Sequence, residues 1–65
     1  MHPRIIYRAT ILSPAGRRSR NFVILQDAYN WLDSENNNYE STTMVEFIEE
    51  DTGRKVDGFF YTQAI

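Results

Sequence analysis

The chain has no cysteine, only one histidine, and only five glycine and proline residues together. Without cysteine it can form neither disulfides nor thiolate metal sites. The one histidine, His2, has no second histidine with which to hold zinc. An aromatic content of 14% argues against a disordered chain. We therefore expect a folded chain with no metal and no cofactor.

No apolar run approaches the roughly 18 residues needed to cross a membrane. The first ten residues, MHPRIIYRAT, contain neither the apolar region nor the small-residue cleavage site of a signal peptide. These two absences predict a cytoplasmic protein that does not bind membranes.

A length of 65 residues predicts a single domain over residues 1–65. A chain of this size buries only about 60% of its extended surface, so its core is thin. Ordinary packing has to stabilise it, with self-association as a possible addition.

Charge is divided unevenly along the chain. Residues 1–20 carry five arginines and no acid, whereas residues 21–65 carry nine acids against Arg54 and Lys55. The two parts therefore have net charges of +5 and −7, which sum to the −2 of the whole chain. Such asymmetry brings opposite charges together within one small fold, coats two solvated surfaces, or marks a tail that binds nucleic acid or a partner.

Residues 4–12 alternate between two faces in the manner of a β-strand. Ser13-Pro14-Ala15-Gly16 predicts a turn, after which residues 17–23 can return as an antiparallel strand. Residues 23–25 are also compatible with an extension of that second strand.

Apolar residues at Leu25, Ala28, Tyr29 and Leu32 predict one amphipathic helix over residues 25–35. The asparagines at 36–38 are expected to end it. Residues 42–49 and 55–62 predict a second hairpin, with Gly53 in its turn. Gly58 inside the last strand suggests a bulge or a close backbone approach.

The order strand, strand, helix, strand, strand predicts a small two-layer α+β domain, ββαββ, with one helix on one face of an antiparallel sheet. The predicted core lies on the helix side and comprises Ile5, Tyr7, Ala9, Ile11, Leu25, Ala28, Tyr29, Leu32, Val45, Phe47 and Phe60. The opposite face would then carry Ile6, Leu12, Met44, Ile48, Phe59 and Tyr61, interrupted by Arg8, Thr10, Glu46 and Asp57.

An apolar sheet face with no helix on it would be unusual for a monomer. Three explanations are open. Residues 63–65 or the Asn-rich loop cover the face, a second copy covers it, or a different protein docks on it.

The residue types offer little for catalysis. No internal histidine or cysteine can form a triad, no Gly-rich phosphate loop is present, and the acids near residue 50 are expected to be solvated. The loop after residue 50 also lacks the ligand spacing of a calcium site. We expect no catalytic residues and no enzymatic activity.

We therefore predict a protein-binding module, such as an inhibitor or adaptor that docks on a larger enzyme. Aromatic anchors and an acidic hairpin that steers the encounter would form its contact surface. The predicted contact residues are Phe59, Tyr61, Met44, Ile48, Glu46, Glu49, Glu50 and Asp51.

Two alternatives remain. Aromatic rings on the sheet could stack on single-stranded nucleic acid while nearby arginines hold phosphates. The arginines concerned are Arg8, Arg17, Arg18 and Arg20. The second alternative is a homodimeric structural module joined through the sheet face or an edge strand.

Overall fold

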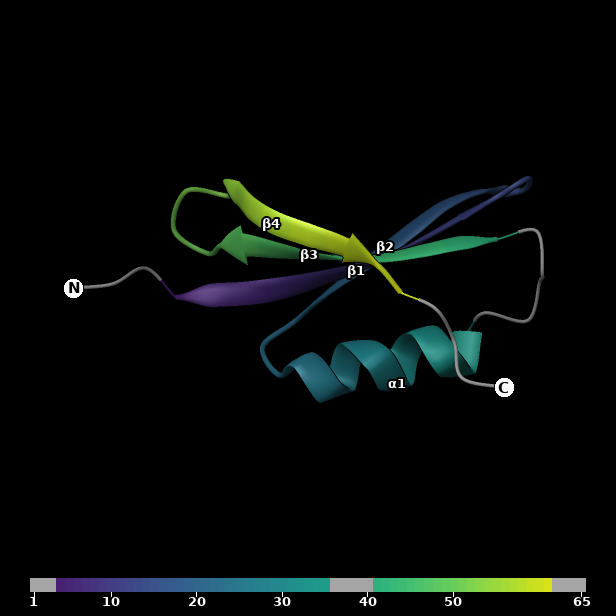
Figure 1. Cartoon of the computed structure of the whole chain (residues 1–65), viewed down its shortest axis with the longest axis horizontal. Coiled ribbons are helices and arrows are strands. Elements are labelled where there is room, and N and C mark those ends of the chain that lie inside the picture. The colour runs from purple at the N-terminus through teal and green to yellow at the C-terminus, as the bar shows by residue number, and fades with distance from the viewer. Residues whose placement is uncertain (1–3, 36–40, 62–65) are drawn as a thin grey trace.

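A computed structural model of the chain describes residues 4–35 and 41–61 and confirms the predicted α+β fold. Its elements are β1 (Ile5–Ser13), β2 (Gly16–Phe22), α1 (Leu25–Glu35), β3 (Thr42–Glu49) and β4 (Lys55–Phe60). The four strands form one antiparallel sheet in the order β2-β1-β3-β4. The helix lies on one face of this sheet (Figure 1).

The first hairpin turns at the predicted glycine. Gly16 has a φ of 136°, in the region where side chains other than that of glycine are strained. The Ser13 hydroxyl donates to the Gly16 carbonyl at 3.2 Å and so fixes the turn. The returning strand ends at Phe22, so Val23 and Ile24 form a bend before α1 rather than an extension of β2.

Helix α1 packs through two residues one turn apart. Ala28 and Leu32 are fully buried, as their i, i+4 spacing predicts. Asp27 lies in the first turn, where its charge complements the helix dipole. The predicted end of the helix at residues 36–38 lies outside the described residues.

The second hairpin has Gly53 at a φ of 74°, as predicted for its turn. Its register shifts between Phe47, which pairs with Asp57, and Ile48, which pairs with Lys55. The predicted irregularity therefore lies just before Gly58. Gly58 itself makes a close approach, since a Cβ there would stand 3.2 Å from Lys55 Cε and 3.3 Å from the Val45 carbonyl oxygen.

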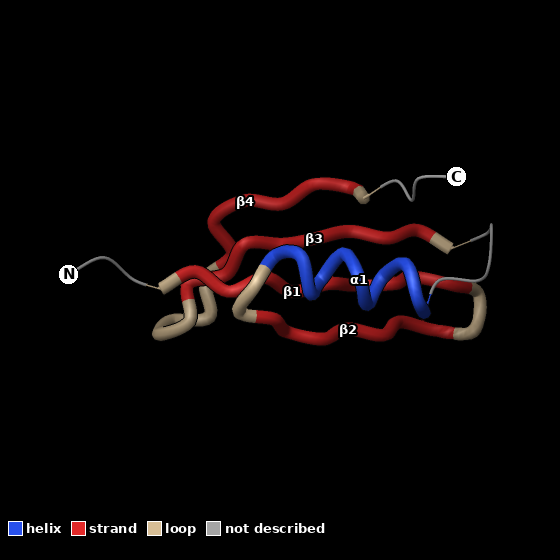
Figure 2. The backbone as a smooth tube through the Cα atoms, turned by 90° about the horizontal axis from the view of Figure 1, so that it is seen from below, coloured by secondary structure: helices blue, strands red, loops and turns tan. Residues whose placement is uncertain are grey.

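The core lies between the helix and the two central strands. Five buried residues form it: Ala9, Ile11, Ala28, Leu32 and Val45. Half-buried apolar residues surround this cluster, among them Phe22 and Trp31, which the sequence pattern did not assign to the core. Their rings lie 6.0 Å apart and close the β2 side. Helix α1 makes its main contacts with β1 and β2, and β4 lies beyond its edge (Figure 2).

The predicted orientation of β4 is wrong. Phe60, assigned to the core, is 72% exposed, while Tyr61 packs against the core. Phe59 pairs with the buried Val45 and therefore points toward the helix. The register shift adds one residue to β4, and a shift of one residue exchanges the two faces of a strand.

Candidate protein-binding surface

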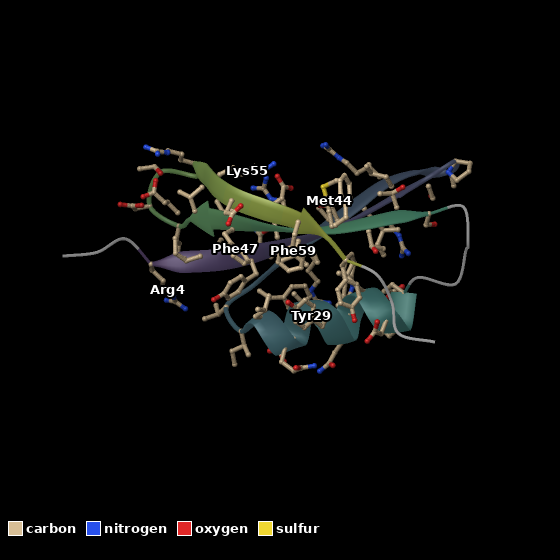
Figure 3. The ribbon with its side chains drawn as sticks, viewed as in Figure 1. Arg4, Tyr29, Met44, Phe47, Lys55 and Phe59 are labelled. Atoms are coloured by element: carbon tan, nitrogen blue, oxygen red, sulfur yellow. The ribbon has the colours of Figure 1, made fainter. Side chains whose placement is uncertain are left out.

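The sheet face opposite α1, here called the open face, draws residues from all four strands. The pairing register and the side-chain bonds place fourteen residues on it, namely Ile6, Arg8, Thr10, Leu12, Arg17, Ser19, Asn21, Thr42, Met44, Glu46, Ile48, Lys55, Gly58 and Phe60. Met44 and Lys55 point away from the helix, whereas Phe47 and Phe59 point toward Tyr29 (Figure 3).

Phe59, a predicted contact residue, belongs to an aromatic row beneath the sheet. Its ring centroid lies 5.8 Å from that of Phe47 and 6.4 Å from that of Tyr29. Because 39% of the residue is still exposed at the sheet edge, it stays partly available to a partner. Its predicted place on the open face is nevertheless wrong.

Tyr61, the second predicted anchor, fastens the end of β4 to the helix. Its ring stacks on Tyr29 with centroids 4.9 Å apart, and its hydroxyl donates to Asp33 Oδ1 at 2.9 Å. Partial burial raises the pKa of Tyr61 above its ordinary value of 10.0, and the neighbouring Asp33 carboxylate raises it further. These internal contacts make Tyr61 a structural residue rather than a free anchor.

The other two predicted apolar contacts differ from each other. Ile48 is only 2% exposed and cannot offer a side chain to a partner. Met44 is half-buried and lies directly across from the exposed Phe60. Met44 is therefore placed where the prediction requires it, and Ile48 is not.

A polar row crosses the open face and divides its apolar residues. Arg8 Nε donates to Asn21 Oδ1 at 3.4 Å, and Arg8 is paired across the strands with Glu46. Glu46 Oε2 in turn lies 3.6 Å from Lys55 Nζ. The open face is therefore not the continuous apolar patch that the sequence suggests.

One exposed aromatic stands beside one hollow on this face. The hollow has a volume of about 140 Å³ and is lined by residues of β3 and β4 only: Met44, Val45, Glu46, Lys55, Gly58, Phe59 and Phe60. Gly58 lines the hollow without a side chain, and a Cβ added there would be crowded by Lys55 Cε and the Val45 carbonyl oxygen. Phe60 and Met44, which face each other across the two strands, form its apolar side.

The predicted acidic hairpin is largely balanced by bases. Glu49 pairs with Arg54 at 3.7 Å, Glu50 pairs with Arg4 at 3.8 Å, and Glu46 pairs with Lys55. Asp57 Oδ1 accepts the backbone N–H of Gly58 at 2.8 Å. The five acids at this end, Asp51 included, thus stand against three bases, which leaves a net charge of −2 rather than −5. Long-range steering by this end is correspondingly weaker.

The four arginines of the nucleic-acid alternative lie on two different faces. Arg8 and Arg17 belong to the open face, whereas Arg18 pairs with Glu35 at the end of α1 at 3.2 Å. Arg20 lies over the Phe22 ring, 5.4 Å from its centroid. Because Phe59 and Tyr61 face the helix, the predicted combination of these rings with Arg8 on one face is absent.

Neither a metal site nor a membrane span is found in the part of the chain that the structure describes. No three His, Cys, Asp or Glu residues within 4–35 and 41–61 come together to hold an ion. No helix in the same ranges is long and apolar enough to cross a membrane.

Comparison of the chain with protein families, with curated proteins and with solved structures gives no match. The function of the chain therefore has to be inferred from its surface.

Sequence reasoning missed Phe60 as the exposed ring and Gly58 as the floor of the hollow. One signal for the true orientation was present on the helix. Tyr29 and Asp33 are one turn apart, and together they offer a stacking surface and a hydrogen-bond acceptor to a tyrosine such as Tyr61.

Proposed function

We propose that this chain is a protein-binding module that contacts its partner through β4 and the adjoining part of the open face. One observation carries the proposal: Phe60 is 72% exposed and stands at the edge of a hollow that is apolar on the Phe60 and Met44 side. Burying a phenylalanine side chain contributes about 2 kcal/mol, and exposed aromatics beside pockets are typical anchors of protein interfaces. The contact residues are thus revised from Phe59 and Tyr61 to Phe60, with Met44 beside it.

Charge supports a contact with protein rather than with nucleic acid. Glu46 lies beside the hollow, and the whole chain has a net charge of −2. Binding to a phosphate backbone needs several bases on one surface, and the arginines here are divided between two faces. The nucleic-acid alternative stays a prediction with less to support it.

The narrower role stays a prediction as well. A non-enzymatic inhibitor or adaptor in the cytoplasm would use the same surface against a larger enzyme. The hairpin acids would then act through short-range contacts, since bases already balance most of their charge.

Site-specific photo-cross-linking tests the proposal. A benzophenone amino acid at position 60 should give a covalent adduct of defined mass that unmodified protein competes away. The matched control is position 23, since Val23 is 56% exposed but lies in the bend before α1. An adduct with a second copy or with another protein supports protein binding. Equal yields from the two positions would contradict it.

A further inference from the structure

The two edges of the sheet are not equivalent. Strand β2 lies at one edge and carries arginines at 17, 18 and 20, and charged side chains of this kind protect an edge from pairing. Strand β4 lies at the other edge and carries three exposed apolar residues, Val56, Phe59 and Phe60. Within residues 4–35 and 41–61 no strand lies on its outer side. The edge open to pairing is therefore β4.

The backbone of β4 presents hydrogen-bonding groups at two positions. The Tyr61 N–H donates to the Thr43 carbonyl at 2.9 Å, so the backbone groups of Tyr61 turn toward β3. Inward and outward residues alternate along an antiparallel strand, which turns the backbone of Gly58 and Phe60 outward. The Gly58 N–H is held by Asp57 at present, and that carboxylate is an exposed group that can move away.

The edge of β4 carries both a projecting ring and a hollow, so the edges of two copies can be complementary in shape. Phe60 projects from the open face and lines the hollow, and Gly58, which also lines it, is two residues away on the same side of the same strand. The Lys55 side chain reaches toward Gly58, with its Cε 3.2 Å from where a Cβ would stand, and this exposed side chain has to turn aside for a ring to lie over Gly58. A space of about 140 Å³ matches the size of cavity that accepts a benzene ring. A phenyl ring from a neighbouring strand can therefore fill it, and an aromatic ring laid over a glycine is a known way to stabilise a strand at that residue.

One register satisfies the backbone and the shape together. If two β4 strands pair antiparallel with Phe59 opposite the partner's Phe59, then Phe60 lies directly opposite the partner's Gly58. Both residues turn their backbone outward, so they form a hydrogen-bonded pair. The two-fold axis that relates the two copies passes between the two Phe59 residues, so the pair of Phe60 with Gly58 occurs twice. Each Phe60 then covers the hollow of the other copy. Asp57 lies opposite the partner's Tyr61, so no like charges face each other in the described part of β4.

We infer that the partner of β4 is a second copy of this chain, joined edge to edge in an antiparallel pair in which each Phe60 lies over the partner's Gly58. The inference rests on the proposed function and specifies its partner. The dimer would contain one continuous sheet of eight strands, with both helices on the same side.

Sedimentation across a concentration series, from micromolar to millimolar, tests the inference with four proteins. The wild type and the Val23→Ser control should show the same concentration-dependent dimer. Phe60→Ser removes one anchor from each copy, and at about tenfold for each anchor the dimer should weaken about a hundredfold. Gly58→Ala places a methyl group in the hollow and should weaken it about tenfold or more. Circular dichroism checks that all four proteins are folded.

Three results would overturn the inference. A wild type that stays monomeric throughout rules out the second copy, yet the proposed function survives if position 60 cross-links to a different protein. A dimer that Phe60→Ser leaves intact uses another surface. A dimer that depends on Phe60 but not on Gly58 pairs in another register.

Discussion

At the scale of single residues, Tyr61 shows how few contacts hold β4 against the helix. Its ring stacks on Tyr29, its hydroxyl reaches Asp33, and its backbone bonds to Thr43. One residue thus connects the last strand to both layers of the fold. The position of its neighbour Phe60 follows directly, because consecutive residues of a strand point to opposite faces.

Replacing Tyr61 with phenylalanine should reveal this connection through pH. The raised pKa means that folding favours the neutral phenol. The contribution of the neutral phenol to the free energy of unfolding is fully present below the ordinary pKa of 10.0. It is lost as the pH rises through the folded-state pKa. Tyr61→Phe should cost about 0.5 to 1 kcal/mol of unfolding free energy near neutral pH.

Urea unfolding at about pH 8 and about pH 11 measures the effect. The stability difference between the wild type and Tyr61→Phe should shrink at the higher pH. A difference that stays constant would show that the Asp33 contact does not hold the phenol in its neutral form.

At the scale of elements, the single helix supplies most of the cover for a thin core. Leu32 is 1% exposed and lies in the buried cluster with Ala28 and three strand residues. Removal of a buried leucine side chain leaves a cavity that a domain of this size has little means to fill.

Leu32→Ala should therefore lower the unfolding free energy by about 2 to 5 kcal/mol. The matched control is Asn30→Ala on the exposed side of the same helix, which should change stability by less than about 0.5 kcal/mol. Thermal unfolding followed by circular dichroism compares the two variants. If both lose the same stability, α1 is not packed through Leu32.

Elements and their order were predictable because they depend on local patterns. The predicted helix over residues 25–35 and the strand over residues 42–49 match the structure, and Gly16 and Gly53 occupy the predicted turns. The orientation of β4 was not predictable. It depends on the register shift beside Ile48, which alternation within the strand does not reveal. The one extra residue that this shift adds to β4 determines that Phe60, and not Phe59, points away from the helix.

The pairing of acidic with basic side chains was likewise not predictable from the sequence. Arg4 is 46 positions away from Glu50, and only the antiparallel pairing of β1 with β3 brings the two to 3.8 Å. The uneven charges of the two parts of the chain therefore meet within the fold. This outcome favours the explanation that the uneven charges come together within one small fold.

At the scale of the whole molecule, β4 is an edge strand of the sheet. The helix lies over β1 and makes its main contacts with β1 and β2, while β4 has β3 on one side and lies beyond the helix (Figure 2). A partner strand added there would extend the sheet and cover Phe60 at the same time. We therefore infer that β4 is the edge at which this protein meets its partner, and that the partner is a second copy.

Isotope-filtered nuclear magnetic resonance on a mixture of labelled and unlabelled protein can detect this pairing of two β4 strands. We expect contacts between the Phe60 ring protons of one copy and the Gly58 α-protons of the other. A dimer whose intermolecular contacts come from β2 or α1 instead of β4 would contradict it.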